Sequence, residues 1–293
     1  MLEWLSSKRV APYLFIGPVL VFAVLLFIGP LLFAAYISFT DWDGMSSPKW
    51  VGLHNYVFLI GRDRFFFTSI WNTLYFAAGF VIVSVPSSLI AAAMINNSRY
   101  QPFWRTVYWL PMITNIVAVA YIWWYILNDT SGLLNRTLDL LGLPGPNWLT
   151  NPSTSMFSVI LVASWMSIGQ NVLVFLSGLT EIDDSYYEAA KLDGANPLQL
   201  FWYVTIPLLR PTILFVLITS LISALSSFVL MLILTEGGPA RSTTVTGLYL
   251  YDMAFTDLRL GRASAAAYIL FGIILAISLV QLRLLRRGGV EAH

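Results

Sequence analysis

A polar segment between two long apolar stretches, residues 181–210, has the composition of a contact surface for another protein. It contains Glu188-Ala189-Ala190 and, after three further residues, Gly194. Alanines favour a helix and present a small surface that a partner can approach closely, and Gly194 permits a left-handed turn where that helix would end. Asp183 is suited to cap the helix start, and Asn196-Pro197 is suited to begin a second short helix. The spacing alone also fits an ordinary helical connector.

A second group of residues has hydrogen-bonding side chains inside apolar segments, where polar groups are costly. Three serines recur at i, i+3 and i+7 on one helix face, and three polar residues stand close together in the preceding segment. These side chains could bind a neutral, hydroxyl-rich solute, or they could hydrogen-bond between packed helices. The two sets are Ser220, Ser223 and Ser227, and Ser167, Gln170 and Asn171.

Several other kinds of chemistry lack the residues they need. The chain has no cysteine and only two histidines, His54 and His293, which are far apart. This excludes thiol chemistry and most zinc sites, so we predict no catalytic residue and no metal site. The acid pairs Asp183-Asp184 and Asp41/Asp43 lie in expected loops and are interpreted as solvated. No lysine ends a phosphate-binding loop, so an energy source such as ATP would have to bind to another subunit.

The composition places the chain in a membrane. Of its 293 residues, 58% are hydrophobic and 11% are charged, and the net charge is +1. Soluble globular proteins carry about 25% charged residues. So much apolar surface cannot be buried in one water-soluble core, and the near-neutral charge gives no basis for nucleic-acid binding.

Six apolar segments are free of ionisable side chains, and each is long enough to cross the hydrocarbon region as a helix. We therefore predict an all-α, polytopic membrane protein with one domain over residues 1–293. The predicted spans are residues 11–39, 68–95, 106–127, 156–180, 211–234 and 263–282.

The orientation follows from the even number of spans and from a slight excess of lysine and arginine in one set of loops. These include Lys8, Arg9 and the pair Arg286-Arg287. Positive charge favours the cytoplasmic side, so both termini are predicted to be cytoplasmic. The spans also lack the buried acids or histidines of proton-coupled carriers.

The segment at 188–207 resembles the signature loop of permease subunits in bacterial ATP-binding-cassette importers. That loop reads Glu-Ala-Ala, three residues, Gly, nine residues, then an aliphatic residue, one residue and an aliphatic-Pro pair, here ending in Val204, Ile206 and Pro207. Further motifs in order, among them the sequences at 38–42, 51–56 and 235–239, resemble the carbohydrate-uptake branch. The resemblance covers nearly the whole chain.

This resemblance implies a coupling helix between the fourth and fifth spans, inside the cell, that docks on an ATPase. It implies that ATP and magnesium bind to two partner ATPase subunits, and that this chain carries no cofactor. The other implied partners are a second permease, an extracytoplasmic solute-binding protein and the lipid bilayer of a prokaryotic plasma membrane. The residues implied to contact the ATPase are Glu188, Ala189, Ala190, Asp193, Gly194 and Ala195.

In sugar permeases of this type, substrate contacts fall on the fourth and fifth spans, so the resemblance assigns the two polar sets above to a substrate path. Because the spans hold no charge, we expect a neutral polyhydroxyl solute. Two other hypotheses remain open at the level of sequence. One is a stand-alone secondary carrier that couples to ions through backbone carbonyls. The other is a membrane scaffold that transports nothing.

Overall fold

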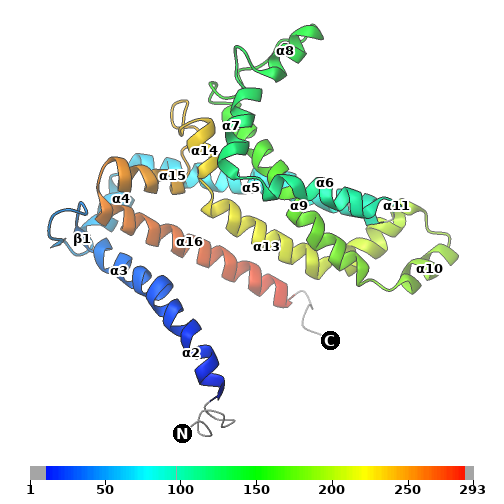
Figure 1. Cartoon of the computed structure of the whole chain (residues 1–293), viewed down its shortest axis with the longest axis horizontal. Helices are drawn as coiled ribbons and strands as arrows, with labels where there is room; N and C mark the ends of the chain where they lie inside the picture. Colours follow the sequence, from blue (N-terminus) through cyan, green and yellow to red (C-terminus); the bar gives the residue numbers. More distant parts are fainter. Residues whose placement is uncertain (1–10, 97, 288–293) are drawn as a thin grey trace. The chain divides into compact units, whose positions relative to one another are not determined.

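The computed structural model describes residues 11–96 and 98–287 and is mostly helical, as predicted (Figure 1). The described part has one antiparallel ribbon, in which β1 (Thr40–Asp41) pairs with β2 (Lys49–Trp50). The chain divides into two compact units. Unit 1 combines Met1–Asp63 with Leu250–Phe271, and unit 2 combines Arg64–Tyr249 with Gly272–His293. Lys8 and Arg9, which were used to predict the orientation, lie outside the described residues.

Unit 1 begins with one long apolar helix. It runs through α2 (Ala11–Ala23), the π-helical turn η1 (Val24–Ile28) and α3 (Gly29–Ser38). This helix coincides with the first predicted span. Its apolar side chains, such as Phe27, are largely exposed. An apolar surface of this kind suits hydrocarbon and not water.

The rest of unit 1 includes short helices in the loops outside the predicted spans. It contains α4 (His54–Gly61), the π-helical η3 (Asp252–Thr256) and the start of α16 (Leu260–Arg287). Asn55 organises the loop after α3, because its side-chain amide donates to the carbonyls of Ser38 at 2.9 Å and Thr40 at 2.8 Å. The first bond satisfies a carbonyl at the end of α3, which has no partner within the helix, and the second fixes the start of β1.

Unit 2 is built on two long helices that lie side by side, α5 (Arg64–Asn96) and α9 (Ser155–Thr180) (Figure 1). Their facing sides are fully buried, with Phe76 on α5 and Phe175 on α9. Glycines let other helices approach α9 closely. A Cβ on Gly169 would lie 1.9 Å from the Tyr108 carbonyl oxygen, and one on Gly178 would lie 2.5 Å from the Thr212 hydroxyl.

The predicted third span is not one straight helix. It consists of α6 (Gln101–Ile113) and α7 (Ile116–Ile126), which are bent by 94°. Thr114 and Asn115 between them are extended, and the Asn115 side chain accepts a 2.8 Å bond from the Val117 amide to start α7. Pro111 also removes one helical hydrogen bond from α6. The sequence pattern missed this break because both halves are apolar.

The predicted fifth span is also broken. Helix α13 (Arg210–Ser226) ends at Ser227, which is extended, and α14 (Val229–Leu234) follows in a new direction. A short helix, α8 (Leu133–Leu140), lies in the loop between the third and fourth predicted spans. Unit 2 also contains α10 (Asp184–Leu192), α11 (Pro197–Leu200), η2 (Phe201–Thr205), α12 (Ile206–Leu208) and most of α15 (Thr246–Tyr251).

Within the described residues, four helical stretches are long and apolar enough to cross a membrane. Two bent pairs, α6 with α7 and α11–α12 with α13, raise the number to six if each pair counts as one span. The four single stretches are Ile16–Ser38, Arg64–Asn96, Ser155–Thr180 and Leu260–Arg283.

The close crossing of α6 and α9 gives a test of this packing. We expect Gly169→Ala to destabilise the protein, since the added methyl meets a backbone oxygen that cannot move alone, and overpacking of this kind costs about 1–3 kcal/mol. The measurement is the thermal unfolding midpoint in detergent, followed by tryptophan fluorescence. Gly272→Ala is the control, because nothing lies within 4 Å of its added Cβ. Equal midpoints for the two variants would contradict the crossing.

Candidate functional site

The 181–210 segment folds as the sequence predicted, and its first helix has a well-formed start. The Asp183 carboxylate accepts a 2.8 Å hydrogen bond from the Ser185 amide and caps α10. Hydrogen bonds from the hydroxyl and the amide of Ser185 lower the pKa of Asp183. Its negative charge at the helix N-terminus also complements the helix dipole.

Gly194 ends α10 in a Schellman motif. Its φ of +84° is the left-handed conformation that glycine adopts at little cost. The Gly194 amide donates to the Lys191 carbonyl, and the Ala195 amide donates to the Ala190 carbonyl, both at 3.0 Å. These two bonds satisfy carbonyls at the helix end and reverse the chain direction. The predicted bend is confirmed.

The second short helix starts with a capping box. The Gln199 amide donates to the Asn196 side chain at 2.9 Å, and the Asn196 amide donates to the Gln199 side chain at 2.8 Å. Pro197 occupies the first helical turn, where a missing N–H costs nothing. Both halves of the segment are therefore held by local bonds, and the turn between them has a defined geometry.

The segment exposes most of the residues predicted to make contacts. Glu188, Ala189, Asp193 and Gly194 are exposed, while Ala190 and Ala195 are half-buried. Sequence reasoning missed Leu192, whose side chain is 89% exposed at the end of α10. The available signal was a leucine between Lys191 and Asp193 in an otherwise polar stretch. Leu192 therefore shares the exposed surface of the predicted contact residues.

A hollow of about 390 Å³ lies where six helices of unit 2 meet, namely α5, α6, α7, α9, α13 and α14, and we call it the serine hollow. It brings together three of the six predicted path residues, Ser167, Ser223 and Ser227. The remaining lining is mostly apolar and includes both helix breaks. The full lining is Phe76, Phe80, Met112, Thr114, Ile116, Ala163, Met166, Ser167, Ser223, Ala224, Ser227 and Leu230.

The other three predicted path residues do not line the serine hollow. The Asn171 amide nitrogen lies 3.4 Å from the Ser220 hydroxyl oxygen, and both side chains are buried. This pair joins α9 to α13, which is the helix-packing role that the sequence left open for such residues. Gln170 is exposed and is not among the lining residues. Of the three serines at i, i+3 and i+7, Ser220 therefore packs against α9, while Ser223 and Ser227 line the serine hollow.

Sequence reasoning missed Thr114 and Ile116, which line the serine hollow from the break between α6 and α7. Ser227 lines it from the break after α13. Helix ends carry backbone groups without an intrahelical partner, so two breaks at one hollow add hydrogen-bonding capacity there. The available signal was Pro111 followed by Thr114-Asn115, a combination that ends one helix and caps another.

The polar residues at the start of α5 hold a loop. The Asn72 side-chain amide donates to the carbonyls of Arg241 at 2.8 Å and Thr244 at 3.0 Å. The Thr73 hydroxyl lies 2.9 Å from that of Thr246 and accepts a 2.7 Å bond from its amide. Asn72-Thr73 therefore anchors the loop that follows α14.

The remaining acidic residues form no catalytic arrangement within the described chain. The Asp43 carboxylate accepts bonds from the amides of Ser46 and Met45 and from the Ser46 hydroxyl, which together lower its pKa to about 2. It is therefore a turn-forming residue. No group of three or more His, Cys, Asp or Glu residues that could hold a metal ion occurs among the residues that the structure describes.

Comparisons with known proteins agree with this architecture. A family model described as "Binding-protein-dependent transport system inner membrane component" matches residues 84–287. The probable ABC transporter permease protein YurN of Bacillus subtilis is 34% identical, with 98% of this chain and 99% of YurN covered. The lactose transport system permease protein LacF of Rhizobium radiobacter is 33% identical, with 94% and 95% covered.

Among solved structures, the chain is similar to one from a bacterial ABC transporter involved in the import of the acidic polysaccharide alginate. The TM-score is 0.85 at 25% sequence identity, and the whole of both chains is covered. A second alginate transporter structure, in complex with a pentasaccharide-bound periplasmic protein, has a TM-score of 0.86 at 24% identity over 99% of each chain.

The absence of native cysteine allows a direct test of the serine hollow. We expect Ser167→Cys, Ser223→Cys and Ser227→Cys to react with a water-soluble maleimide in membrane vesicles, at rates about tenfold or more above Ser220→Cys. The reason is that Ser220 is buried against Asn171 and a thiol there has no access to solvent. Labelling is read by a gel shift or by mass spectrometry. Similar rates at all four positions would contradict the assignment.

Proposed function

The chain belongs to the family of binding-protein-dependent transport system inner membrane components, and we propose that it is the permease subunit of an ATP-driven importer for a sugar or related polyhydroxyl solute. The observation that carries this proposal is end-to-end similarity to permeases. YurN aligns over almost the full length of both chains, and the described helices match a solved importer permease along its whole chain. These relatives are transporter subunits and not enzymes.

Names of relatives support a carbohydrate substrate. They include the arabinooligosaccharides permease AraP and the lactose permease LacF. The relatives also include a permease for sn-glycerol-3-phosphate and the alginate importer, whose substrates are anionic. In this chain no charged side chain is among the residues described as lining the serine hollow. A neutral solute fits such a lining because its hydroxyls need hydrogen bonds and no counter-charge.

Residues 181–210 are the proposed coupling segment, with α10 as the helix that docks on the ATPase. The support is the exposure of Glu188, Ala189 and Asp193 on a helix whose two ends are tightly capped. A rigid, exposed helix with small side chains can enter a groove of a partner without losing much conformational entropy. ATP and magnesium would bind to the ATPase, and this chain would supply only the contact.

The proposed complex has a second permease, two ATPase subunits and an extracytoplasmic solute-binding protein. A solved relative in complex with a sugar-bound periplasmic protein supports the last partner. The proposed topology has six spans, with the two bent helix pairs counted as one span each. Both termini and the coupling segment would then lie in the cytoplasm of a prokaryotic cell.

Transport would follow from the position of α13. This helix begins directly after the coupling segment, and its last turn and the residue after it supply Ser223 and Ser227 to the serine hollow. Closure of the ATPase dimer around ATP would displace α10, and α13 would carry that displacement to the hollow as a rigid body. The serine hollow would then face the two sides of the membrane in turn.

The experiment that tests the proposed function is purification of the chain from its own host in mild detergent, followed by reconstitution in liposomes. We expect a second permease and an ATPase to accompany it, and solute uptake to require ATP and a solute-binding protein. Uptake by this chain alone without ATP, driven by an ion gradient, would instead indicate a secondary carrier.

The coupling segment has a specific test at Gly194. We expect Gly194→Asp to insert and fold normally but to reduce ATPase co-purification by about tenfold. Aspartate tolerates positive φ better than most residues, so the turn is kept while bulk and charge enter the contact surface. Gly142→Asp is the matched control, because Gly142 also has a positive φ of +71° and open space around it. Equal ATPase recovery for both variants would overturn the assignment.

The solute path has a test of its own. We expect Ser223→Ala and Ser227→Ala to raise the KM for uptake several-fold each, since each removes one hydrogen bond to the solute, worth about 0.5–1.5 kcal/mol. Gln170→Ala should leave KM unchanged, because Gln170 does not line the serine hollow. The measurement is uptake of labelled solute by the reconstituted complex. An effect confined to Gln170→Ala would place the path elsewhere.

A further inference from the structure

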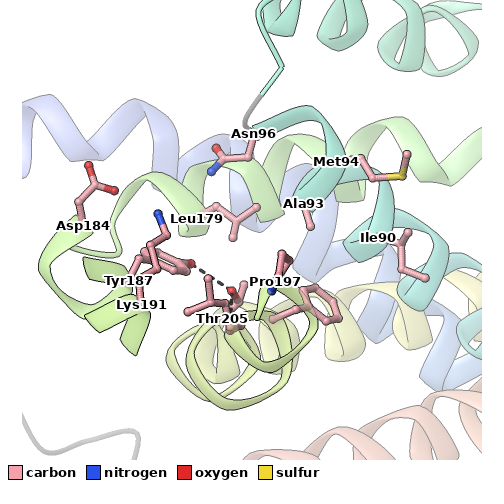
Figure 2. A pocket seen from close by; sticks show the side chains of 12 residues that line it. Ile90, Ala93, Met94, Asn96, Leu179, Asp184, Tyr187, Lys191, Pro197 and Thr205 are labelled. Atoms are coloured by element: carbon pink, nitrogen blue, oxygen red, sulfur yellow. Dashed lines mark hydrogen bonds between the residues drawn. The ribbon is translucent and has the colours of Figure 1, made fainter. Parts of the chain in front are cut away.

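Helix α10 has little packing to hold it in place. None of its described residues is buried. Beside it lies a hollow of about 580 Å³, which separates α10 from the end of α5 (Figure 2). Asp184, Tyr187 and Lys191 of α10 line this hollow together with Ile90 and other residues of α5. A helix with so few apolar contacts depends on other interactions for its position.

One side-chain hydrogen bond joins α10 to η2, the turn that precedes α12 and α13. The Tyr187 hydroxyl oxygen lies 3.1 Å from the Thr205 hydroxyl oxygen, and this bond is drawn in Figure 2. Thr205 is buried, and its hydroxyl also donates to the Leu200 carbonyl at 3.3 Å. A hydroxyl has one proton to donate. The Tyr187 hydroxyl must therefore donate to Thr205, which gives a directed chain from Tyr187 through Thr205 to Leu200.

The Tyr187–Thr205 bond contacts the chain at the end of a π-helical turn, shortly before the bend into α13. Thr205 is the last residue of η2, a single π-helical turn, and such turns occur often at functional positions. The following residues, α12, lead directly into α13, and the two parts meet at a bend of 70°. The backbone route between α10 and η2 passes through the Gly194 turn. The Tyr187–Thr205 bond is a second route that bypasses this turn.

We infer that Tyr187 is a positioning residue that transmits the displacement of α10 to α13 through its hydrogen bond to Thr205. This inference rests on the proposed coupling function of α10. In this arrangement the ATPase contacts Glu188 and Ala189, which do not line the hollow, whereas Tyr187 does line it. Docking and transmission therefore depend on different side chains of the same helix and can be separated by mutation.

The test compares variants of the complete, reconstituted importer. Tyr187→Phe removes one hydroxyl, Thr205→Val removes the other, and Thr205→Ser keeps a hydroxyl at the same position. Tyr203→Phe is the matched control, because it makes the same chemical change within η2 at a side chain that is 78% exposed. Each variant is measured for ATPase recovery on purification and for solute molecules transported per ATP hydrolysed.

We expect Tyr187→Phe and Thr205→Val to recover normal amounts of ATPase and to lower the transport-to-hydrolysis ratio by about fivefold, the equilibrium effect of one ordinary hydrogen bond. The double variant should be no worse than Thr205→Val alone, since Thr205→Val already removes the bond that Tyr187→Phe removes, together with the bond to the Leu200 carbonyl. Thr205→Ser should restore most of the ratio, and Tyr203→Phe should leave it unchanged.

The inference is overturned if Tyr187→Phe keeps the normal ratio, if the two changes are additive, or if Tyr203→Phe has the same effect. It is also overturned if Tyr187→Phe reduces ATPase recovery in proportion to the ratio, because Tyr187 would then act in docking. Failure of the proposed function is visible separately in the unmodified complex, which would transport without ATP or recover no ATPase.

Discussion

The structure depends on one constraint, which is that every backbone polar group in an apolar surrounding needs a hydrogen-bond partner. Helices meet this need internally, so the long apolar segments of the chain are helical. Breaks are acceptable only where side chains, water or a bound solute can take over the missing bonds. The breaks at Thr114-Asn115 and at Ser227 both border the serine hollow. These two breaks therefore lie where water or a bound solute in the serine hollow can hydrogen-bond to the free backbone groups.

The proposed coupling segment is exposed, so few buried side chains are available to hold its shape. Its stability is local and comes from the Asp183 cap, the Schellman turn at Gly194 and the capping box at Asn196. These bonds join residues that are close in the sequence, so they do not depend on packing against distant helices. An exposed helix built in this way can present Glu188 to a partner without rearranging first.

Helix α13 joins these two regions. At its start it is continuous with the coupling segment through η2 and α12, and near its other end Ser223 reaches the serine hollow. The buried Asn171–Ser220 pair ties it to α9 partway along, and Gly178 allows a close approach to Thr212 nearer its start. In the proposed mechanism this continuous helix carries a displacement from the coupling segment to the serine hollow.

The sequence by itself determined the apolar helical segments, the polar segment at 181–210 with its bend at Gly194, and the family. It could do so because apolar run length, caps and a glycine at a turn are local signals. Only the tertiary structure decided which polar residues share a hollow. Ser220 and Ser223 look alike in sequence, but one packs against Asn171 and the other lines the hollow, because this depends on where α9 crosses α13. The helix breaks could not be predicted, because an apolar composition does not show where a helix changes direction. The Tyr187–Thr205 bond could not be predicted either, because two hydroxyls 18 residues apart leave no periodic pattern in the sequence.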